Sequence, residues 1–562
     1  MDIKIKTSRF IRKNRYHLIL FVLIFLATVS QIVWIKLNAA PPMMWDDAGY
    51  LIHSLNNYYT LIDDGMLKFV QIFTQIITFH PPLITILPIP FYFIFGNSTF
   101  SSLLVYTFFI VTFCIYLFLL TKEILNERVA LLAVTITSLF PLTYGLWRQF
   151  MIEFGLVTLV VTYLFYLIKS NEFRELKYII PLGIIGGLGL LMKETFPIFI
   201  IGPTIYFLIQ AILHLKKERI LIFARNITLL LFLSLLIAGP WYVKNFQKMI
   251  EFGLRHAFRE AGKPWSLGPI LSWRTLIDYW TNIINFGISS YFFWLMVILV
   301  VSIILLRKRV FSQTALWFLG SWFLVPFSIF SMVVFKEVRH ILSILPVLGI
   351  VIGAFLDNLL FYRKRKKQVV LYSLLSLFPL FNFFYLSFDL PSNLRKDINC
   401  GPFVLFKKDL HKLSQAQNPL YTFPINREKW PLEQIIQIIL EKCDDNDNPY
   451  VLMAVEHPYF NGCTLEYQTL LSRVSLRIND IVMLGGKEEI INGIFSCDFL
   501  ITKTGHQGPK FVNSWNQWVQ EKLDKKEFQF EEISRVALPD QSEALIYKNF
   551  KNKTRTGGQI EL

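Results

Sequence analysis

The chain has 562 residues, of which 54% are hydrophobic and only 17% are charged. A soluble protein carries about 25% charged residues, and the apolar residues here form long blocks, so the composition excludes a soluble globular protein. The net charge of +16 does not indicate nucleic-acid binding, because Lys and Arg gather in short clusters between the apolar blocks, as in the cytoplasmic loops of membrane proteins.

Eleven apolar blocks approach or reach the ~20 residues that cross a hydrocarbon core of about 30 Å. The first block follows a basic N-terminal segment and is longer than the core of a usual signal peptide, so we interpret it as a retained helix. We predict an α-helical polytopic membrane protein with about eleven transmembrane helices. The blocks are 16–37, 99–121, 129–147, 151–168, 178–195, 196–213, 222–243, 286–306, 312–334, 341–361 and 368–388.

The connections between these blocks alternate in charge. Every second one is short and carries Lys or Arg: 122–128, 169–177, 214–219, 306–309 and 362–367. The positive-inside rule places these connections and the N-terminus in the cytoplasm. The first loop (38–98), the loop 242–285 and the C-terminal portion are then expected on the extracytoplasmic face of a plasma membrane.

One further apolar stretch, residues 80–96, contains Pro81, Pro82, Pro88 and Pro90. Each proline removes a backbone hydrogen-bond donor. If this stretch crossed the membrane, every later basic connection would move to the outside. We therefore predict an interfacial or re-entrant segment.

The composition becomes that of a globular domain after residue 390, so we predict a membrane domain at 1–390 and a small extracytoplasmic α/β domain at 391–562. Strand-like and helix-like runs alternate there, which favours this class. The expected strands are 449–456, 477–486, 497–504, 533–539 and 543–549, with helices at 465–475, 487–495 and 510–526.

Four of the five cysteines fall in this second domain: Cys400, Cys443, Cys463 and Cys497. An extracytoplasmic location permits disulfides, and four cysteines allow three pairings. Disulfides and four unpaired thiols both remain open.

Ionisable residues at the membrane are costly and tend to be functional, and here they gather on the expected outer face. Acids come from the first loop and from the start of the fourth block, and cations come from the fifth block and the start of the tenth. They are Asp46, Asp47, Arg148, Glu153, Lys193, Lys336, Arg339 and His340. This set suits sugar transfer from a phosphate-linked donor, because a carboxylate can take the proton of an attacking hydroxyl while cations neutralise the departing phosphate.

Structural alternatives exist for each of these residues. Charged residues at helix ends are often solvated caps or interfacial anchors, and Lys193 can snorkel towards the interface. His80 can serve only to start a half-helix before its two prolines. We take Glu194 as structural.

Four motifs follow one another in the order found in a known superfamily. They are WDDAGY (45–50), HPPLITILPIPFYFIFG (80–96), WRQFMIEFGL (147–156) and GGLGLLMKETFP (186–197). With these motifs, roughly residues 10–390 resemble the GT-C superfamily of polytopic glycosyltransferases, closest to the branch of protein O-mannosyltransferases and bacterial aminoarabinose transferases. AGPWYVKN and KEVRHILSILPVLG resemble later landmarks of that superfamily.

The resemblance implies an inverting transfer of a sugar from a polyprenyl-phosphate donor to an acceptor hydroxyl on a lipid, glycan or protein. Asp46 would be the catalytic base beside Asp47, and Glu153 would help bind the acceptor or a divalent cation. The donor phosphate would meet Lys193, Arg339, His340 and Lys336, and substrate binding would involve Trp45, Tyr50, His80 and Arg148. Two features depart from the pattern: Glu153 stands where Asp is common, and the C-terminal domain does not resemble the β-trefoil of the eukaryotic mannosyltransferases.

Other functions share parts of this pattern. A lipid-linked glycan flippase or a transporter would show internal repeats and charges near the middle of the membrane, and the sequence has neither. A glycan ligase shares the architecture, and a membrane-anchored binding protein would have its function in residues 400–550.

Overall fold

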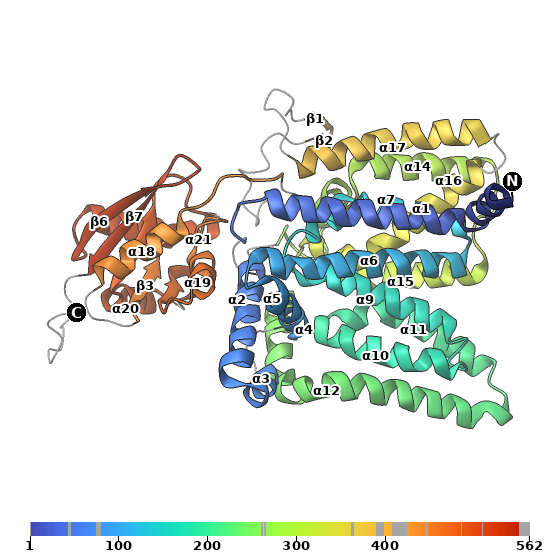
Figure 1. Cartoon of the computed structure of the whole chain (residues 1–562), viewed down its shortest axis with the longest axis horizontal. Coiled ribbons are helices and arrows are strands. Elements are labelled where there is room, and N and C mark those ends of the chain that lie inside the picture. The colour runs from blue at the N-terminus through green and yellow to red at the C-terminus, as the bar shows by residue number, and fades with distance from the viewer. Residues whose placement is uncertain are drawn as a thin grey trace.

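The computed structural model describes residues 2–42, 46–74, 80–259, 262–263, 266–360, 365–388, 398–406, 422, 424–443, 448–484, 486–508 and 510–549. A bundle of long helices occupies one part of the molecule and a mixed sheet with its helices occupies the other (Figure 1). The predicted domain boundary at residue 390 lies outside the described residues, as does Trp45.

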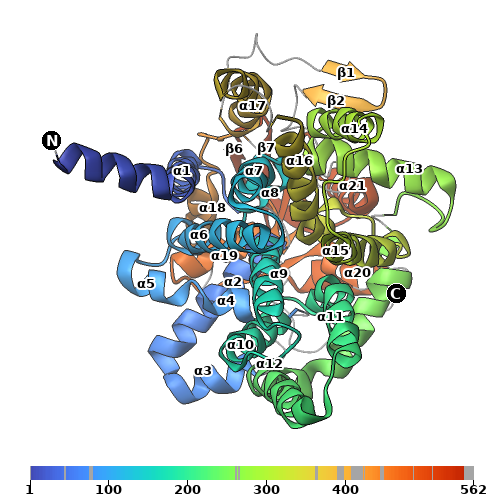
Figure 2. The same cartoon turned by 90° about the vertical axis from the view of Figure 1, so that its right-hand side faces the viewer.

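Within the described ranges, the helical bundle is built from twelve helices. They are α1 (Asp2–Leu37), α6 (Thr99–Ile124), α7 (Glu127–Ser138), α8 (Pro141–Leu146), α9 (Ile152–Lys169), α10 (Leu176–Met192), α11 (Phe196–Leu213), α12 (Ile220–Phe258), α14 (Ser290–Leu305), α15 (Gln313–Ser331), α16 (Leu345–Leu360) and α17 (Arg365–Ser387). Helix α9 lies in the middle of the bundle (Figure 2) and is buried on nearly all sides.

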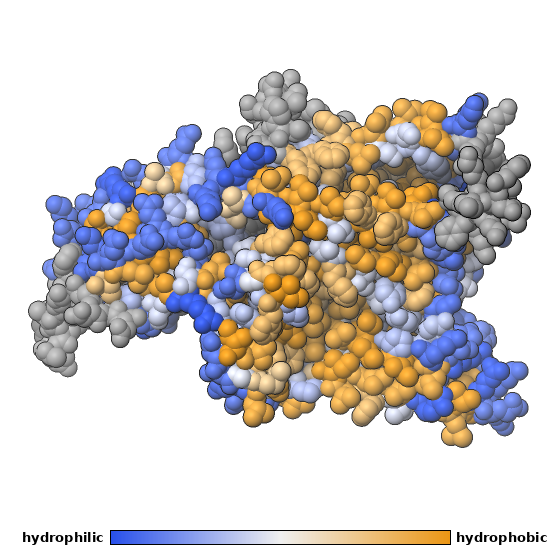
Figure 3. All heavy atoms as spheres, viewed as in Figure 1, coloured by the Kyte–Doolittle hydropathy of each residue, from blue (hydrophilic) through white to orange (hydrophobic). Residues whose placement is uncertain are grey.

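Eight of the eleven predicted blocks form described helices that are long and apolar enough to cross a membrane, and a bent pair, Trp273–Ile288 with Ser290–Leu305, raises that number to nine. The two other blocks are shorter: α10 has 17 residues, and block 129–147 is divided between α7 and α8. On the face drawn in Figure 3, a broad apolar belt covers the bundle between more polar ends. The chain is a multi-pass membrane protein, and the predicted fold class is confirmed.

Glycines allow α10 and α12 to pack closely. A Cβ on Gly183 or Gly187 would lie within 3.0 Å of side-chain and backbone atoms of α12. The Ser234 hydroxyl of α12 donates to the Gly183 carbonyl at 2.9 Å. Small residues that let helix backbones approach are typical of membrane interfaces, which explains the repeated glycines of this part of the sequence.

Short helices cover one end of the bundle. The first loop forms α2 (Asp46–Tyr59), the π turn η1 (Thr60–Asp64), α3 (Met66–Phe73), α4 (Leu83–Ile86) and α5 (Ile89–Phe95). The last two are too short to span about 30 Å of hydrocarbon. Helix α13 (Trp273–Asn282), the π turn η4 (Ile283–Ile288) and the 3₁₀ helix η5 (Val338–Ile344) belong to later connections.

One predicted boundary is wrong in this region. The loop expected to start at residue 242 begins much later, because α12 continues to Phe258. Polar residues that favour helix, such as Lys244 and Glu251, follow the apolar part of α12 without a break, so the end of the apolar block does not mark the end of the helix.

The C-terminal part contains a small hairpin and a five-stranded sheet of order β4-β3-β5-β7-β6. Strand β3 is parallel to β4 and β5, and β7 is antiparallel to β5 and β6. The elements are β1 (Ile398–Cys400), β2 (Phe403–Phe406), α18 (Leu432–Lys442), β3 (Tyr450–Met453), α19 (Gly462–Leu471), β4 (Arg477–Asp480), α20 (Lys487–Ser496), β5 (Phe499–Lys503), α21 (Lys510–Asp524), β6 (Phe530–Ala537) and β7 (Glu543–Asn549).

Two apolar layers cover the two faces of this sheet. One contains Ile435 and Ile439 of α18, and the other contains Ile490 and Ile494 of α20. The predicted α/β class is confirmed. Cys497 is a buried free thiol, so the alternative in which all four cysteines form two disulfides is wrong.

The start of α1 and the C-terminal sheet lie on opposite sides of the bundle. Helix α1 begins at the end far from the sheet, and α2 stands across the end near the sheet (Figure 1). The N-terminus and the C-terminal sheet therefore lie on opposite sides of the bundle, in agreement with the topology that the basic connections predict.

Candidate functional site

The centre of the candidate site is a carboxylate at the first residue of α2. The Oδ2 atom of Asp46 lies 2.6 Å from Nη2 of Arg339. An acidic side chain is stabilised at a helix N-terminus by the helix dipole, which suits the Asp-Asp start of α2. The Asp46 side chain is 39% exposed, so one face of this carboxylate remains accessible from outside the protein.

A second carboxylate, Glu153, lies in the first turn of α9 and is almost fully buried. Its Oε1 atom accepts a hydrogen bond from Lys193 Nζ at 2.9 Å. Lys193 caps the end of α10, where the backbone turns from helical to extended. Since the Lys193 side chain is only 5% exposed, it does not snorkel to the surface but points inward to Glu153.

The segment before α16 contributes the remaining charges. Arg339 Nε lies 2.5 Å from Glu337 Oε2 and 3.8 Å from Glu153 Oε1. The Nδ1 atom of His340 lies 3.2 Å from Lys193 Nζ. Arg339 thus touches carboxylates from α2, α9 and its own segment, and we call the set Asp46, Glu153, Lys193, Glu337, Arg339 and His340 the charged cluster.

Next to this cluster lies a His–Glu pair. His80 Nδ1 and Glu194 Oε2 are 3.0 Å apart, and both side chains are about one-fifth exposed. Burial alone would raise the pKa of Glu194, but the charges of His80 and Lys193 and the hydrogen bond from His80 lower it to about 2. The aromatic ring of Tyr50 lies 6.2 Å from that of His80, so two residues predicted to bind substrate, Tyr50 and His80, lie near each other and near Asp46.

The electrostatic field at Asp46 favours its charged form. Partial burial would raise the pKa of Asp46, but Arg339, His80 and Lys193 outweigh this effect and hold the pKa below its usual value. Burial raises the pKa of Glu337 above its usual value, with Asp46 and Glu153 adding to the increase and Arg339 opposing it. Asp46 is therefore an ionised, accessible carboxylate next to cations.

Asp47 lies apart from this arrangement. Its Oδ1 atom accepts a hydrogen bond from the backbone N–H of Phe150 at 2.8 Å, and the residue is buried. This contact ties the start of α2 to the connection between α8 and α9.

Arg148 lies in an aromatic cage. Its guanidinium carbon is 5.1–5.6 Å from the ring centres of Trp34, Tyr144 and Phe383, and Nη1 donates to the Ser387 hydroxyl at 2.7 Å. Among the described residues it contacts no carboxylate of the charged cluster.

Lys336 is used at a helix end. Its Nζ donates to the carbonyls of Phe330, Ser331 and Val333 at 3.3, 2.5 and 2.6 Å. A lysine at a helix C-terminus satisfies carbonyls that have no partner within the helix, and here the helix is α15.

Sequence reasoning missed two members of the site. Glu337 stands between Lys336 and Arg339, and Glu194, which the sequence predicts to be structural, follows Lys193. The available signal is that each of these acids is adjacent to a cation predicted to lie in the site. Sequence alone does not show which of two neighbouring charges points inward, because helix ends and 3₁₀ turns do not fix that direction.

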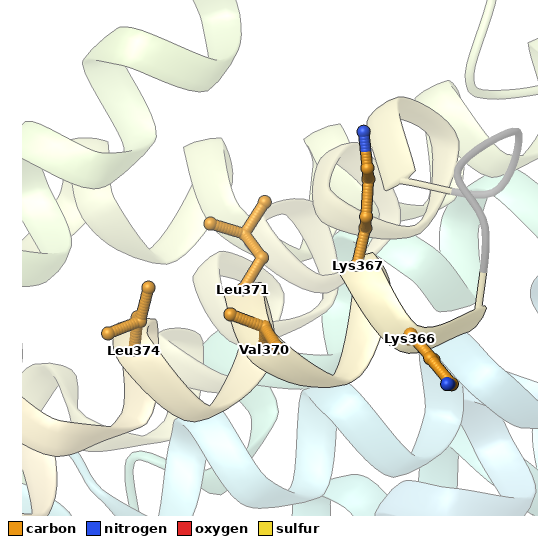
Figure 4. Close-up of a pocket in the computed structure, with 5 residues that line it drawn as sticks. All are labelled: Lys366, Lys367, Val370, Leu371 and Leu374. Carbon is orange, nitrogen blue, oxygen red and sulfur yellow. The ribbon is translucent and has the colours of Figure 1, made fainter.

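In the part of the chain that the structure describes, no group of three or more His, Cys, Asp or Glu side chains is arranged to hold a metal ion. A shallow hollow of about 250 Å³ lies on α17, lined by Lys366, Lys367, Val370, Leu371 and Leu374. Figure 4 shows the two lysines pointing in different directions from one helix. This hollow is at the start of α17, whereas Ser387 at its other end meets Arg148, so it is not part of the candidate site.

The fold is similar to several solved structures. ArnT from Cupriavidus metallidurans matches in the apo state with a TM-score of 0.55 and 14% identity, covering 96% of this chain and 99% of that chain. With undecaprenyl phosphate bound, ArnT matches with a TM-score of 0.56 and 13% identity over the same shares. The oligosaccharyltransferase AglB from Archaeoglobus fulgidus, in complex with an inhibitory peptide and a dolichol-phosphate, matches with 0.52 and 11%, covering 97% of this chain and 75% of that chain.

Residues 79–238 also match the sequence family described as dolichyl-phosphate-mannose-protein mannosyltransferase. No curated protein matches the chain in sequence. The family match and the fold confirm the predicted resemblance and support a membrane glycosyltransferase of the GT-C superfamily. Among the compared structures, ArnT is similar over nearly the whole length of both chains.

Proposed function

We propose that this protein transfers a sugar from a polyprenyl-phosphate donor to an acceptor hydroxyl at the extracytoplasmic face of the membrane. The observation that carries the proposal is the position of Asp46, which is accessible on one face and paired with Arg339 on the other. The ArnT and AglB structures with bound lipid phosphates, and the family match, support a donor of this class.

In the proposed reaction, the acceptor oxygen attacks the anomeric carbon as its proton passes to the Asp46 carboxylate. The bond between that carbon and the phosphate oxygen breaks, and the polyprenyl phosphate leaves with the electron pair. One displacement of this kind inverts the configuration of the anomeric carbon. General-base assistance contributes typically about 10²–10⁴-fold in rate.

Burial distinguishes Asp46 from the two other carboxylates of the charged cluster. The side chains of Glu153 and Glu337 are 2% and 12% exposed, against 39% for Asp46. An acceptor hydroxyl can therefore reach Asp46 most easily, while Glu153 and Glu337 neutralise the cations beside it.

Lys193 and Arg339 are proposed to stabilise the charge that develops on the departing phosphate. Both cations are held rigidly by carboxylates before a donor arrives. Preorganised charges require no reorganisation at the moment of reaction. His80, held by Glu194, is proposed to contact the same donor.

The position of the site along the bundle supports the proposed face. Helix α2, whose first residue is Asp46, stands across the end of the bundle near the sheet, and α1 begins at the other end (Figure 1). The basic connections are predicted at the end where α1 begins. Under the positive-inside rule the site is then extracytoplasmic, where a membrane-embedded donor and an aqueous acceptor can meet.

The test is to incubate the purified protein with radiolabelled polyprenyl-phosphate sugars and an extracytoplasmic membrane fraction, and to follow the label into lipid, glycan and protein. We expect transfer by the wild type and a loss of about 10³-fold in Asp46→Asn. Asp64→Asn, a change at an exposed acid of the same loop, is the matched control and should retain activity. Parallel reactions with a chelator determine whether a divalent cation takes part.

Full activity of Asp46→Asn would overturn the role of the base. Absence of label transfer from every polyprenyl-phosphate sugar, with a folded protein, would overturn the donor class.

A further inference from the structure

The soluble domain contacts the membrane bundle through α19. Tyr467 of this helix is 2% exposed and belongs to the same continuous apolar core as the bundle, whereas the two layers of the sheet form separate cores. Its hydroxyl lies 3.0 Å from the Thr99 hydroxyl at the start of α6. Helix α19 therefore packs as part of the bundle as well as part of the sheet domain.

The main neighbour of α19 at this contact is α2, the helix that begins with Asp46. The Tyr59 hydroxyl at the end of α2 donates to the Leu470 carbonyl at 2.9 Å. Just beyond, Arg473 lies 4.4 Å from the Tyr59 ring centre and 3.7 Å from Asp63. Figure 1 shows α2 between the bundle and α19.

The soluble domain also approaches the first turn of α2. Burial raises the pKa of Tyr459, which precedes α19, and the negative charge of the nearby Asp47 adds to this increase. The soluble domain therefore lies near the start of α2 and contacts its end.

A second attachment lies directly upstream of α2. The backbone N–H of Ala39 donates to the Asn426 carbonyl at 2.6 Å, and the Asn38 side chain accepts from the Asn426 N–H at 3.0 Å. Ile425 beside it is buried in the bundle core. The segment that carries Asp46 is therefore held by the C-terminal part of the chain at both of its ends, residues 38–39 and residue 59.

These contacts matter because α2 has only 14 residues. Isolated helices shorter than about 12–15 residues are marginal in water, and most helical stability in proteins comes from packing. The other side of α2 meets α4 and α5 through two hydrogen bonds, Asn57 to Thr85 at 2.9 Å and Tyr92 to Ser54 at 3.2 Å. Without α19, one whole side of this short helix would lose its neighbours.

We propose that the soluble domain positions the catalytic carboxylate: α19 and residues 425–426 hold α2 against the bundle, so that Asp46 keeps its 2.6 Å contact with Arg339. Tyr467 is the main positioning residue of this clamp. This proposal rests on the proposed role of Asp46. It gives the C-terminal domain the role of holding the catalytic base in position, rather than a separate binding function.

The test uses the full-length protein with Tyr467→Ala, which removes the buried ring, and Tyr467→Phe, which retains it. In Tyr467→Ala we expect faster amide hydrogen exchange in α2, a fall in kcat of about tenfold or more, and a KM for the donor that stays within about threefold. The acidic limb of the pH–rate profile should move to higher pH, because a displaced Asp46 loses the cations that lower its pKa. Tyr467→Phe should stay close to the wild type in all four measurements.

Gln468→Ala is the matched control on the other side of α19, where Gln468 donates to Glu433 within the soluble domain at 3.2 Å. It should change neither exchange in α2 nor kcat. If Tyr467→Ala does not fold, Arg473→Glu, which places like charges beside Asp63, is measured in the same way and should show the same changes in smaller degree.

Unchanged exchange in α2 and unchanged kcat in the folded variants would overturn the clamp. Exchange reports on α2 without any reference to catalysis. A faster exchange in α2 together with full activity of Asp46→Asn would therefore leave the clamp standing as a structural contact and overturn the proposed base.

Discussion

Two arginines lie buried at the same end of the bundle, and their surroundings differ. Arg339 contacts the carboxylates of Asp46 and Glu337, whereas Arg148 contacts three aromatic rings and the Ser387 hydroxyl. A guanidinium can be accommodated in a protein by opposite charge or by the faces of aromatic rings. Only the first arrangement presents paired charges to a substrate, so burial of a cation alone does not mark a site.

The comparison extends to the lysines of the same region. Lys193 binds the buried carboxylate of Glu153, while Lys336 binds three backbone carbonyls at the end of α15. Arg339 and Lys193 thus contact carboxylates of the charged cluster, whereas Arg148 and Lys336 stabilise the structure around them. We expect substitutions of the two kinds to have separable effects on activity and on stability.

Among the substitutions that test this comparison of cations, the largest effect is expected from Glu153→Gln, because it leaves Lys193 and Arg339 beside a neutral group in a buried place. Breaking a buried ion pair from one side costs about 3–5 kcal/mol. We expect a clear fall in the thermal unfolding midpoint and a loss of transfer of about 100-fold or more. The double variant Glu153→Gln with Lys193→Met should regain part of the stability but none of the activity. Recovery of both stability and activity would show that the Glu153–Lys193 pair contributes to folding alone.

Next in size is Arg339→Gln, which removes the partner of Asp46. Since Arg339 lowers the pKa of Asp46 and burial raises it, the variant should have a higher pKa at this carboxylate. A general base works only when deprotonated, so activity is lost as pH falls through the pKa, and the acidic limb of kcat/KM should move to higher pH. We expect a loss of about tenfold near neutral pH and a larger loss at acidic pH. An acidic limb at the same pH as in the wild type would contradict this account of the pair.

A smaller change is expected from Glu194→Ala, which removes the carboxylate beside His80. A partner that fixes the tautomer and orientation of a histidine is a common feature of active sites. Transfer should fall by about fivefold, and Glu194→Gln, whose amide oxygen can still accept the hydrogen bond, should lose less. Steady-state kinetics with varied donor concentration would measure both. Equal losses in the two variants would show that the negative charge matters, rather than the orientation of His80.

The smallest effect is expected from Arg148→Met. The substituted side chain is flexible and can fill the aromatic cage, so transfer should remain within about threefold of the wild type. Initial rates and the unfolding midpoint would be measured together. A loss of more than about 30-fold in a folded protein would place Arg148 in substrate binding, the role expected from the sequence.

Much of the fold could be predicted from the sequence where a single physical cause dominates. Blocks of apolar residues must cross or approach the bilayer, and alternating basic connections must lie on one side. The order of the membrane helices could therefore be predicted from these two patterns. The last strand, Glu543–Asn549, matches its predicted range in full. The end of α12 could not be predicted from hydropathy. Residues that favour helix continue beyond the apolar block, where hydropathy no longer marks the helix.

The candidate site could be predicted less completely. Asp46, Glu153, Lys193 and Arg339 were selected because they fall on one membrane face in four separate elements, and the structure brings them together. Arg148 and Lys336 satisfied the same criterion, but they point towards aromatic rings and helix carbonyls instead. Glu337 and Glu194 were not selected, since the direction of a side chain at a helix end depends on packing that the sequence does not show.

The central claim is that α2 and the segment before α16 meet at one accessible face, with residues 46 and 339 in contact. In a cysteine-free background, the pair Asp46→Cys and Arg339→Cys can be tested in intact cells with a membrane-impermeant thiol reagent and a short bifunctional crosslinker. We predict that both positions react from outside the cell and that the crosslinker joins them, while Asp64→Cys paired with Arg339→Cys is not joined. Reaction from opposite sides of the membrane, or no link between positions 46 and 339, would contradict the account.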